Sequence, residues 1–284
     1  MMNSLRQLFS HRRFIGVAMI FFVLSILFSF WITYIPHVKE KLSLSEGELG
    51  LALFFMPVGL LLSMFVSGWL NRKWGEGVIT VGGILLYGAL MPLPVIAPDF
   101  ALLAGALFLT GFASGLTDVA MNALADTLEK QHKVYIMAAC HGFFSLGGMV
   151  GALIGGLVLS YIPISPFAHI SISAVLIMLA LWGTGIFGQL WHIRAPSTGK
   201  EKVFAFPRGA LLGLSLLAFT IMLCEGSVAD WSGVYLRQMV PNEGGIVAMG
   251  YAAFSLMMTI GRLYGDQLIF RLGRRNIMVA GNAT

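Results

Sequence analysis

Two acidic residues stand inside long apolar stretches of this sequence. Asp118 lies in the stretch 100–125, and Glu225 lies in the stretch 209–233. A charged side chain at the centre of a bilayer costs about 2.5–3.5 kcal/mol on insertion scales. A carboxyl group there can bind a proton on one side of the membrane and release it on the other. We therefore predict that Asp118 and Glu225 couple proton movement, together with His141, whose imidazole exchanges a proton near neutral pH.

Asp118 belongs to a polar stripe with a period of four. The members are Thr110, Ser114, Asp118, Asn122 and Asp126. Steps of four keep side chains on one face of a helix, so this face is predicted to line a bundle interior or a water-filled cavity. We expect Asn122 to bind solute and Asp126, near the end of the stretch, to belong to a gate. The alternative is hydrogen bonding between helices, which small polar side chains commonly provide.

Hydroxyl and aromatic side chains elsewhere suggest a binding surface for a sugar or another polar solute. The predicted solute-binding residues, besides Asn122, are Ser29, Thr33, Tyr34, Ser145 and Trp231. Ser29 and Thr33 are four residues apart, and Ser145 shares a helix face with His141. Core packing and anchoring at the membrane interface are the alternative roles of these residues.

Long apolar helices must position all of these groups. The apolar stretches cover approximately residues 14–36, 47–70, 78–97, 100–125, 135–161, 167–190, 209–233 and 245–270. Hydrophobic residues make up 57% of the 284 residues and charged residues only 11%. A membrane-spanning helix needs roughly 20 apolar residues. The sequence therefore predicts an all-α membrane protein with about eight transmembrane helices, and not a soluble or disordered chain.

Signals of a soluble enzyme do not occur in this sequence. It contains no Walker loop, no dinucleotide-binding fingerprint and no His/Cys cluster with metal-ligand spacing. Cys140 and Cys224 each lie in an apolar run, which predicts two buried thiols and no disulfide framework. We expect a protein that is not an enzyme and that uses neither a metal nor a cofactor.

The basic residues predict the orientation in the membrane. With a cytoplasmic N-terminus, 14 of the 18 Lys and Arg residues are cytoplasmic, and Arg262 lies within the last stretch. Lys39, Lys41 and Arg237 are then outside. This distribution follows the positive-inside rule and predicts a multi-pass protein of the inner membrane. It also explains the net charge of +5 without a nucleic-acid partner. The expected partners are the lipid bilayer, a small-molecule solute and protons, and the expected state is a monomer.

A polar segment and a repeated motif divide the chain. Residues 191–207 are predicted to be a cytoplasmic linker between a six-helix bundle, 1–190, and an incomplete second bundle, 208–284. The sequences GWLNRKWGEG, at 68–77, and DQLIFRLGRR, at 266–275, both have Leu third and Gly eighth. A bundle repeated in this way is typical of transporters.

The motif at 68–77 resembles the signature loop of the major facilitator superfamily, a family of membrane transporters. Gly68, Leu70, Lys73 and Gly75 match that signature. Arg72 stands where the family has Asp, and Glu76 stands where it has Arg, an exchange that preserves a possible ion pair. The residues to which we assign gating roles, besides Asp126, are Arg72, Lys73, Glu76, Arg262 and Asp266. Arg262 and Asp266, four residues apart, are expected to pair with each other.

Three further segments resemble an uncharacterised bacterial branch of this superfamily, with some likeness to fucose permeases. They are DVAMN at 118–122, CHGFFSLGG at 140–148 and CEGSVADW at 224–231. The resemblance implies a fold of twelve helices, so we expect a C-terminally truncated chain that ends near the ninth. Glycines recur at steps of four at Gly147 and Gly151, which predicts close helix packing; a partial antiporter motif is the alternative.

Together these features predict a secondary active transporter. It would move a small polar solute, a sugar or another organic molecule, across the cytoplasmic membrane by alternating access, coupled to protons. A membrane-embedded binding or sensor protein is one alternative, and an inactive fragment of a longer transporter is another. The sequence leaves open the choice between symport and antiport, and between proton and sodium coupling.

Overall fold

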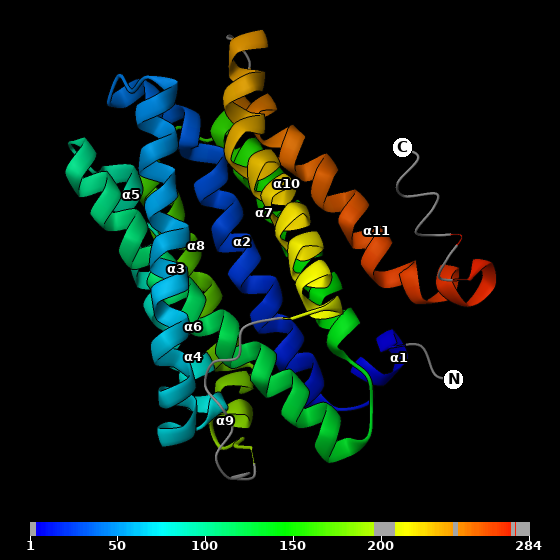
Figure 1. The fold of residues 1–284 in the computed structure, drawn as a ribbon. Helices are drawn as coiled ribbons and strands as arrows, with labels where there is room; N and C mark the ends of the chain where they lie inside the picture. The colour runs from blue at the N-terminus through cyan, green and yellow to red at the C-terminus, as the bar shows by residue number, and fades with distance from the viewer. Residues whose placement is uncertain (1–3, 196–207, 241–243, 274–275, 277–284) are drawn as a thin grey trace.

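The computed structural model describes residues 4–195, 208–240, 244–273 and 276 (Figure 1). Its helices in chain order are α1 (Ser4–Leu8), α2 (Arg12–Lys41), α3 (Glu46–Trp74), α4 (Glu76–Leu90), α5 (Leu93–Ile96), α6 (Phe100–His132), α7 (Met137–Tyr161), α8 (Pro166–Gly183), α9 (Ile186–Trp191), α10 (Ala210–Met239), the 3-10 helix η1 (Gly244–Ala248) and α11 (Met249–Leu272). In these ranges, eight helical segments are long and apolar enough to cross a membrane. The predicted all-α membrane fold with about eight spans is therefore confirmed.

Carboxylates set the starting points of two long helices. At the start of α3, the Ser45 hydroxyl accepts the backbone N–H of Glu48, and the Glu48 carboxylate accepts the N–H of Ser45. This reciprocal pair is a capping box, which satisfies two donors that the helix itself leaves unpaired. The side chain of Ile136, the N-cap residue of α7, makes no capping hydrogen bond. Instead, Glu129 near the end of α6 accepts the N–H groups of Ile136, at 2.5 Å, and Met137, at 2.7 Å.

The long helices run between two ends of the bundle, which we call the Arg12 end and the Lys41 end after the limits of α2. The most extensive helix pairs are α3 with α6, α2 with α7, α4 with α6, and α7 with α11. α2 is the central helix, and its side chains from Phe14 to Val38 contribute more residues to the buried apolar core than those of any other described helix. The linker residues 196–207 lie outside the described part of the chain.

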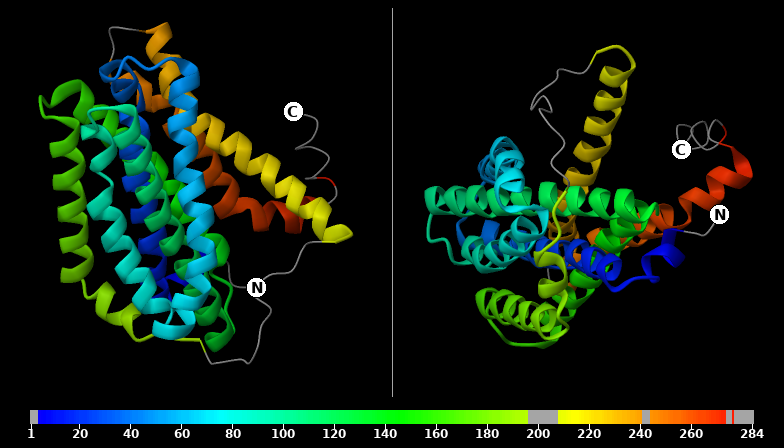
Figure 2. Two further views of the ribbon diagram at one scale, coloured as in Figure 1. Left: turned by 60° about the vertical axis from the view of Figure 1, so that its left-hand side comes forward. Right: turned by 90° about the horizontal axis from the view of Figure 1, so that it is seen from below.

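α10 meets the other helices only through its second half. Residues 211–224 of this helix are exposed, and Figure 2 shows this half (yellow) projecting away from the bundle. The second half contacts η1, α11 and α2. Cys140 on α7 is buried as predicted, but the prediction of a buried Cys224 is wrong, because Cys224 lies on the projecting half of α10.

Helices α2 and α7 approach each other closely along a seam at Gly147 and Gly151 of α7. A Cβ atom added at Gly147 would lie 2.2 Å from the carbonyl oxygen of Phe22, and one at Gly151 would lie 2.8 Å from that of Ile26. Such distances leave no room for a side chain, so the predicted close packing of this glycine stripe is confirmed. The seam brings α7 directly against the centre of α2.

Candidate functional site

The candidate site is a charged cluster that joins three helices. The guanidinium of Arg262, on α11, donates from Nη2 to Glu225 of α10, at 3.2 Å to Oε1 and 3.4 Å to Oε2. Its Nη1 donates to Oγ of Ser145 on α7, at 2.7 Å. The side chains of Arg262 and Glu225 are 26% and 30% exposed. The pair is half-buried, so removing one partner leaves the charge of the other only partly compensated by water.

His141 lies beside this cluster, one helical turn before Ser145. The Ser145 hydroxyl donates to the backbone oxygen of His141 at 3.3 Å, and the imidazole packs edge-on against Phe21, with ring centroids 5.2 Å apart. The structure thus brings together Glu225 and His141, predicted to couple protons, and Ser145, predicted to bind solute. The fourth residue of the group, Arg262, was predicted to be a gating residue.

Three buried hydroxyl groups border the cluster where α2, α7 and α11 meet. They surround Gly148: a Cβ atom there would lie 2.9 Å from Oγ of Ser255, 3.1 Å from Oγ of Ser25 and 3.2 Å from Oη of Tyr251. Sequence reasoning did not single out Tyr251 and Ser255, because one serine or tyrosine in an apolar helix carries no signal of its neighbours in space.

Asp118 and Asn122 form a separate polar pair on α6. The Asn122 amide donates to the backbone oxygen of Asp118 at 2.9 Å and to its carboxylate Oδ1 at 3.2 Å. Both side chains are half-buried. Within the described part of the chain, no hydrogen bond or ion pair joins this pair to His141 or Glu225. The predicted proton-coupling residues therefore fall into two groups on different helices.

The predicted solute-binding hydroxyls of α2 are engaged in helix packing. Ser29 donates to the backbone oxygens of Ser25, at 2.8 Å, and of Gly148 on α7, at 2.9 Å. Thr33 donates to the backbone oxygen of Ser29 at 2.9 Å. Ser29 and Thr33 are both buried. In this structure both hydroxyls donate to backbone oxygens inside the helix bundle, which agrees with core packing, the alternative role of these residues.

The two predicted aromatic residues also have partners in the protein. Oη of Tyr34 lies 2.9 Å from Nδ1 of His169 on α8, and both residues are buried. Trp231 of α10 packs near α3, because a Cβ atom at Gly50 would lie 3.5 Å from Cζ2 of its ring. Neither ring is directed at the Glu225–Arg262 cluster by a contact that the structure describes.

The predicted gate at the Arg12 end has other partners than expected. Glu76 is buried and accepts the N–H of Ala195 at 2.8 Å, and Arg194 donates to the backbone oxygen of Arg72. The expected Arg72–Glu76 pair is not among the ion pairs of the described residues. A buried carboxylate next to a free backbone N–H takes that donor, while the Arg72 side chain stays exposed. The loop between α3 and α4 is thereby tied to the chain after α9.

The remaining gating predictions have separate outcomes. Lys73 lies over the rings of Trp69, at 4.8 Å, and Trp74, at 5.2 Å, and Asp126 forms an exposed ion pair with Lys130. The side chain of Asp266 lies outside the described residues. Arg262 binds Glu225 and Ser145, which the local spacing of Arg262 and Asp266 did not reveal. Among the described residues, no group of three His, Cys, Asp or Glu side chains is placed to hold a metal ion.

Comparison with known proteins identifies a family and three relatives to which this chain is similar. The family model described as Major Facilitator Superfamily matches residues 13–283. An uncharacterized MFS-type transporter of Yersinia pestis is 36% identical over 273 residues, covering 94% of this chain and 69% of that protein. The membrane protein MosC of Rhizobium meliloti is 29% identical over 265 residues, covering 93% of this chain and 63% of that protein. An uncharacterized transporter of Sinorhizobium fredii is 30% identical over 264 residues, covering 92% and 69%. The chain thus spans about two thirds of the length of these relatives.

Proposed function

The chain belongs to the Major Facilitator Superfamily, a family of membrane transporters and not of enzymes, and on that premise we propose that it is a proton-coupled secondary transporter of a small polar solute. The solute binds between a first helical bundle, 1–190, and a second, 208–284, joined by the linker 191–207. Alternating access then exposes it to each side in turn. The charge bias supports an inner-membrane protein with a cytoplasmic N-terminus.

The Glu225–Arg262–Ser145 cluster is the observation that carries this proposal. Ser145 belongs to the proposed first bundle, whereas Glu225 and Arg262 belong to the second, so the cluster crosses between them. A proton on Glu225 removes the negative charge that Arg262 binds. Arg262 then relies on Ser145 and on any polar solute that enters the site. Proton binding and solute binding are thereby linked through one guanidinium group.

Other predicted residues have supporting roles in this proposal. His141 adjoins the cluster through Ser145, and Asp118 with Asn122 forms a second polar site on α6. The hydroxyls of Ser25, Tyr251 and Ser255 favour a solute with hydroxyl groups, such as a sugar. The three relatives do not carry the fucose-permease likeness, so a sugar as the solute rests on these hydroxyl groups alone.

Transport in proteoliposomes tests the proposal. A panel of monosaccharides and small organic acids is screened for uptake driven by an imposed pH gradient, and the solute-induced proton flux is followed with an entrapped pH dye. We expect Glu225→Gln to abolish the pH-driven component and Glu46→Gln, an exposed acid outside the cluster, to retain it. Full uptake by Glu225→Gln with unaltered pH dependence would remove Glu225 from the mechanism. Binding without counterflow would instead favour a sensor protein.

A further inference from the structure

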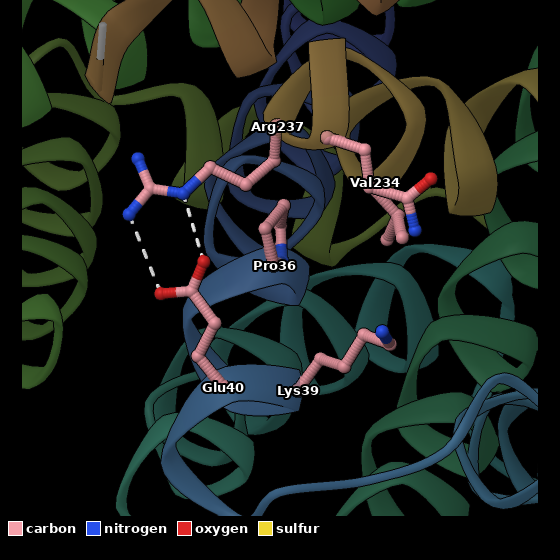
Figure 3. Close-up of a pocket in the computed structure, with 6 residues that line it drawn as sticks. Pro36, Lys39, Glu40, Val234 and Arg237 are labelled. Atoms are coloured by element: carbon pink, nitrogen blue, oxygen red, sulfur yellow. Dashed lines mark hydrogen bonds and ion pairs between the residues drawn. The ribbon is translucent and has the colours of Figure 1, made fainter. Parts of the chain in front are cut away.

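A bidentate ion pair joins α2 and α10 at the Lys41 end of the bundle. Nε of Arg237 donates to Oε1 of Glu40 at 2.8 Å, and Nη2 donates to Oε2 at 3.3 Å (Figure 3). Beside the pair lies a cavity of about 280 Å³. The cavity is lined by Pro36, Lys39, Glu40, Val234, Arg237 and Gln238. Parallel hydrogen bonds between a guanidinium and a carboxylate add directionality to the charge attraction.

Contacts between α10 and the first bundle gather at this same end. A Cβ atom at Gly233 would lie 3.5 Å from Cγ of Pro36, so the two backbones are close to each other. Trp231 packs near α3 in the same region. Toward the Arg12 end, residues 211–224 of α10 are exposed. The proposed bundles therefore touch through α10 at the Lys41 end and are apart along the other half of this helix.

A second ion pair at the same end provides a comparison. Nζ of Lys39 lies 2.9 Å from Oε1 of Glu46, but this pair joins α2 to α3 within the first bundle. When the Lys41 end opens, α10 must separate from α2, and the Glu40–Arg237 pair has to break. The Lys39–Glu46 pair keeps both of its partners. Of these two neighbouring ion pairs, Glu40–Arg237 crosses between the proposed bundles and Lys39–Glu46 does not.

We propose that Glu40 and Arg237 are gating residues whose ion pair stabilises the conformation closed at the Lys41 end. This inference rests on the proposed alternating-access function, which requires that end to open and close. The Arg237 and Glu40 side chains are 34% and 51% exposed, so water and salt screen their attraction. Exposed pairs shift an equilibrium by about two- to fivefold. An attraction of this size favours closure and still allows the end to open in each cycle.

Cysteine modification measures this equilibrium without a solute. Val234 lines the cavity and is only 5% exposed, so a cysteine at Val234→Cys reacts chiefly when the end opens. The protein carries Cys224→Ser to remove the exposed native thiol. In nanodiscs a hydrophilic maleimide reaches both faces, which makes the measurement independent of membrane orientation. The rate is compared among Glu40→Gln, Arg237→Gln and the control Glu46→Gln, which breaks the Lys39–Glu46 pair without changing the lining of the cavity.

We expect Glu40→Gln and Arg237→Gln each to raise the modification rate about two- to fivefold. The control Glu46→Gln leaves the rate unchanged, and the charge exchange Glu40→Arg with Arg237→Glu restores the slow rate. Equal rates in the parent and both gating variants would overturn the inference, as would equal acceleration by the control variant. The assay uses neither solute nor proton gradient, so a failure of the proposed proton coupling at Glu225 leaves its result intact.

Discussion

Adding one methyl group at Gly147 should separate the helices that hold the candidate site. In Gly147→Ala, the new Cβ would lie 2.2 Å from the Phe22 carbonyl oxygen, whereas ordinary contact begins at about 3.4 Å. The obstacle is backbone, which has no alternative rotamer, so α2 and α7 must move apart by about 1 Å. Overpacking of this kind typically costs about 1–3 kcal/mol. The shift would also move Ser145 relative to Arg262.

A second glycine supplies the control for this variant. Gly82 lies inside α4, is exposed and has no neighbouring atom within 4 Å of an added Cβ. Replacing glycine by alanine within a helix contributes up to about 1 kcal/mol of stability. Both variants share this gain, so the difference between Gly147→Ala and Gly82→Ala isolates the packing cost.

The assay is unfolding of the purified protein in detergent, followed by tryptophan fluorescence. We expect Gly147→Ala to be less stable than Gly82→Ala by about 1–3 kcal/mol, and to unfold at a lower temperature. Equal stability of the two variants, within about 0.5 kcal/mol, would refute the close α2–α7 approach on which the site geometry depends.

Three further predictions concern side chains whose removal leaves a hydrogen-bonding or charged partner without its contact. Glu225→Gln should lower the free energy of unfolding by about 1–3 kcal/mol, because Arg262 loses its counter-charge, and adding Arg262→Gln should cost less than the sum of the single losses; additive losses in a thermal-unfolding cycle would contradict the pair. Tyr34→Phe should cost about 1–3 kcal/mol, because Nδ1 of the buried His169 loses its partner, and an unchanged unfolding temperature would exclude that contact. Glu129→Ala should cost about 0.5–2 kcal/mol, since the first N–H groups of α7 lose their acceptor, and Glu129→Gln should recover part of the loss; an unfolding temperature of Glu129→Ala equal to that of the parent would show that the carboxylate is no cap.

The ion-pair partner of Arg262 shows how far a prediction from spacing along one helix extends. A spacing of four predicts that Arg262 pairs with Asp266, since both would lie on one face of α11. The structure pairs Arg262 with Glu225 on another helix. A guanidinium on a long side chain reaches groups from several helices, and the acid that shares its surroundings competes with the acid that shares its helix. The spacing along α11 gave no sign of the contact with Glu225, and the expected pairing with Asp266 stays a prediction, because that side chain lies outside the described residues.

Hydropathy and helical periodicity were enough to predict the number and type of the spans. Each span is a local run of apolar residues, and a helix satisfies its backbone hydrogen bonds within its own segment, so its existence does not depend on distant partners. The glycines at positions 147 and 151 also predicted close packing, because small residues at steps of four leave one face of the helix open to a neighbouring helix. The same local information suggested Glu225 and His141 as functional residues.

Only the tertiary structure decided which of these residues meet. Ser145, Glu225 and Arg262 come from three helices separated by up to 117 positions in the chain, and no local pattern records their distance in space. The structure likewise places Asp118 apart from this cluster and directs Ser29 toward the backbone of α7. A polar residue in an apolar helix shows that a partner is needed, and the packing of the helices determines which partner that is.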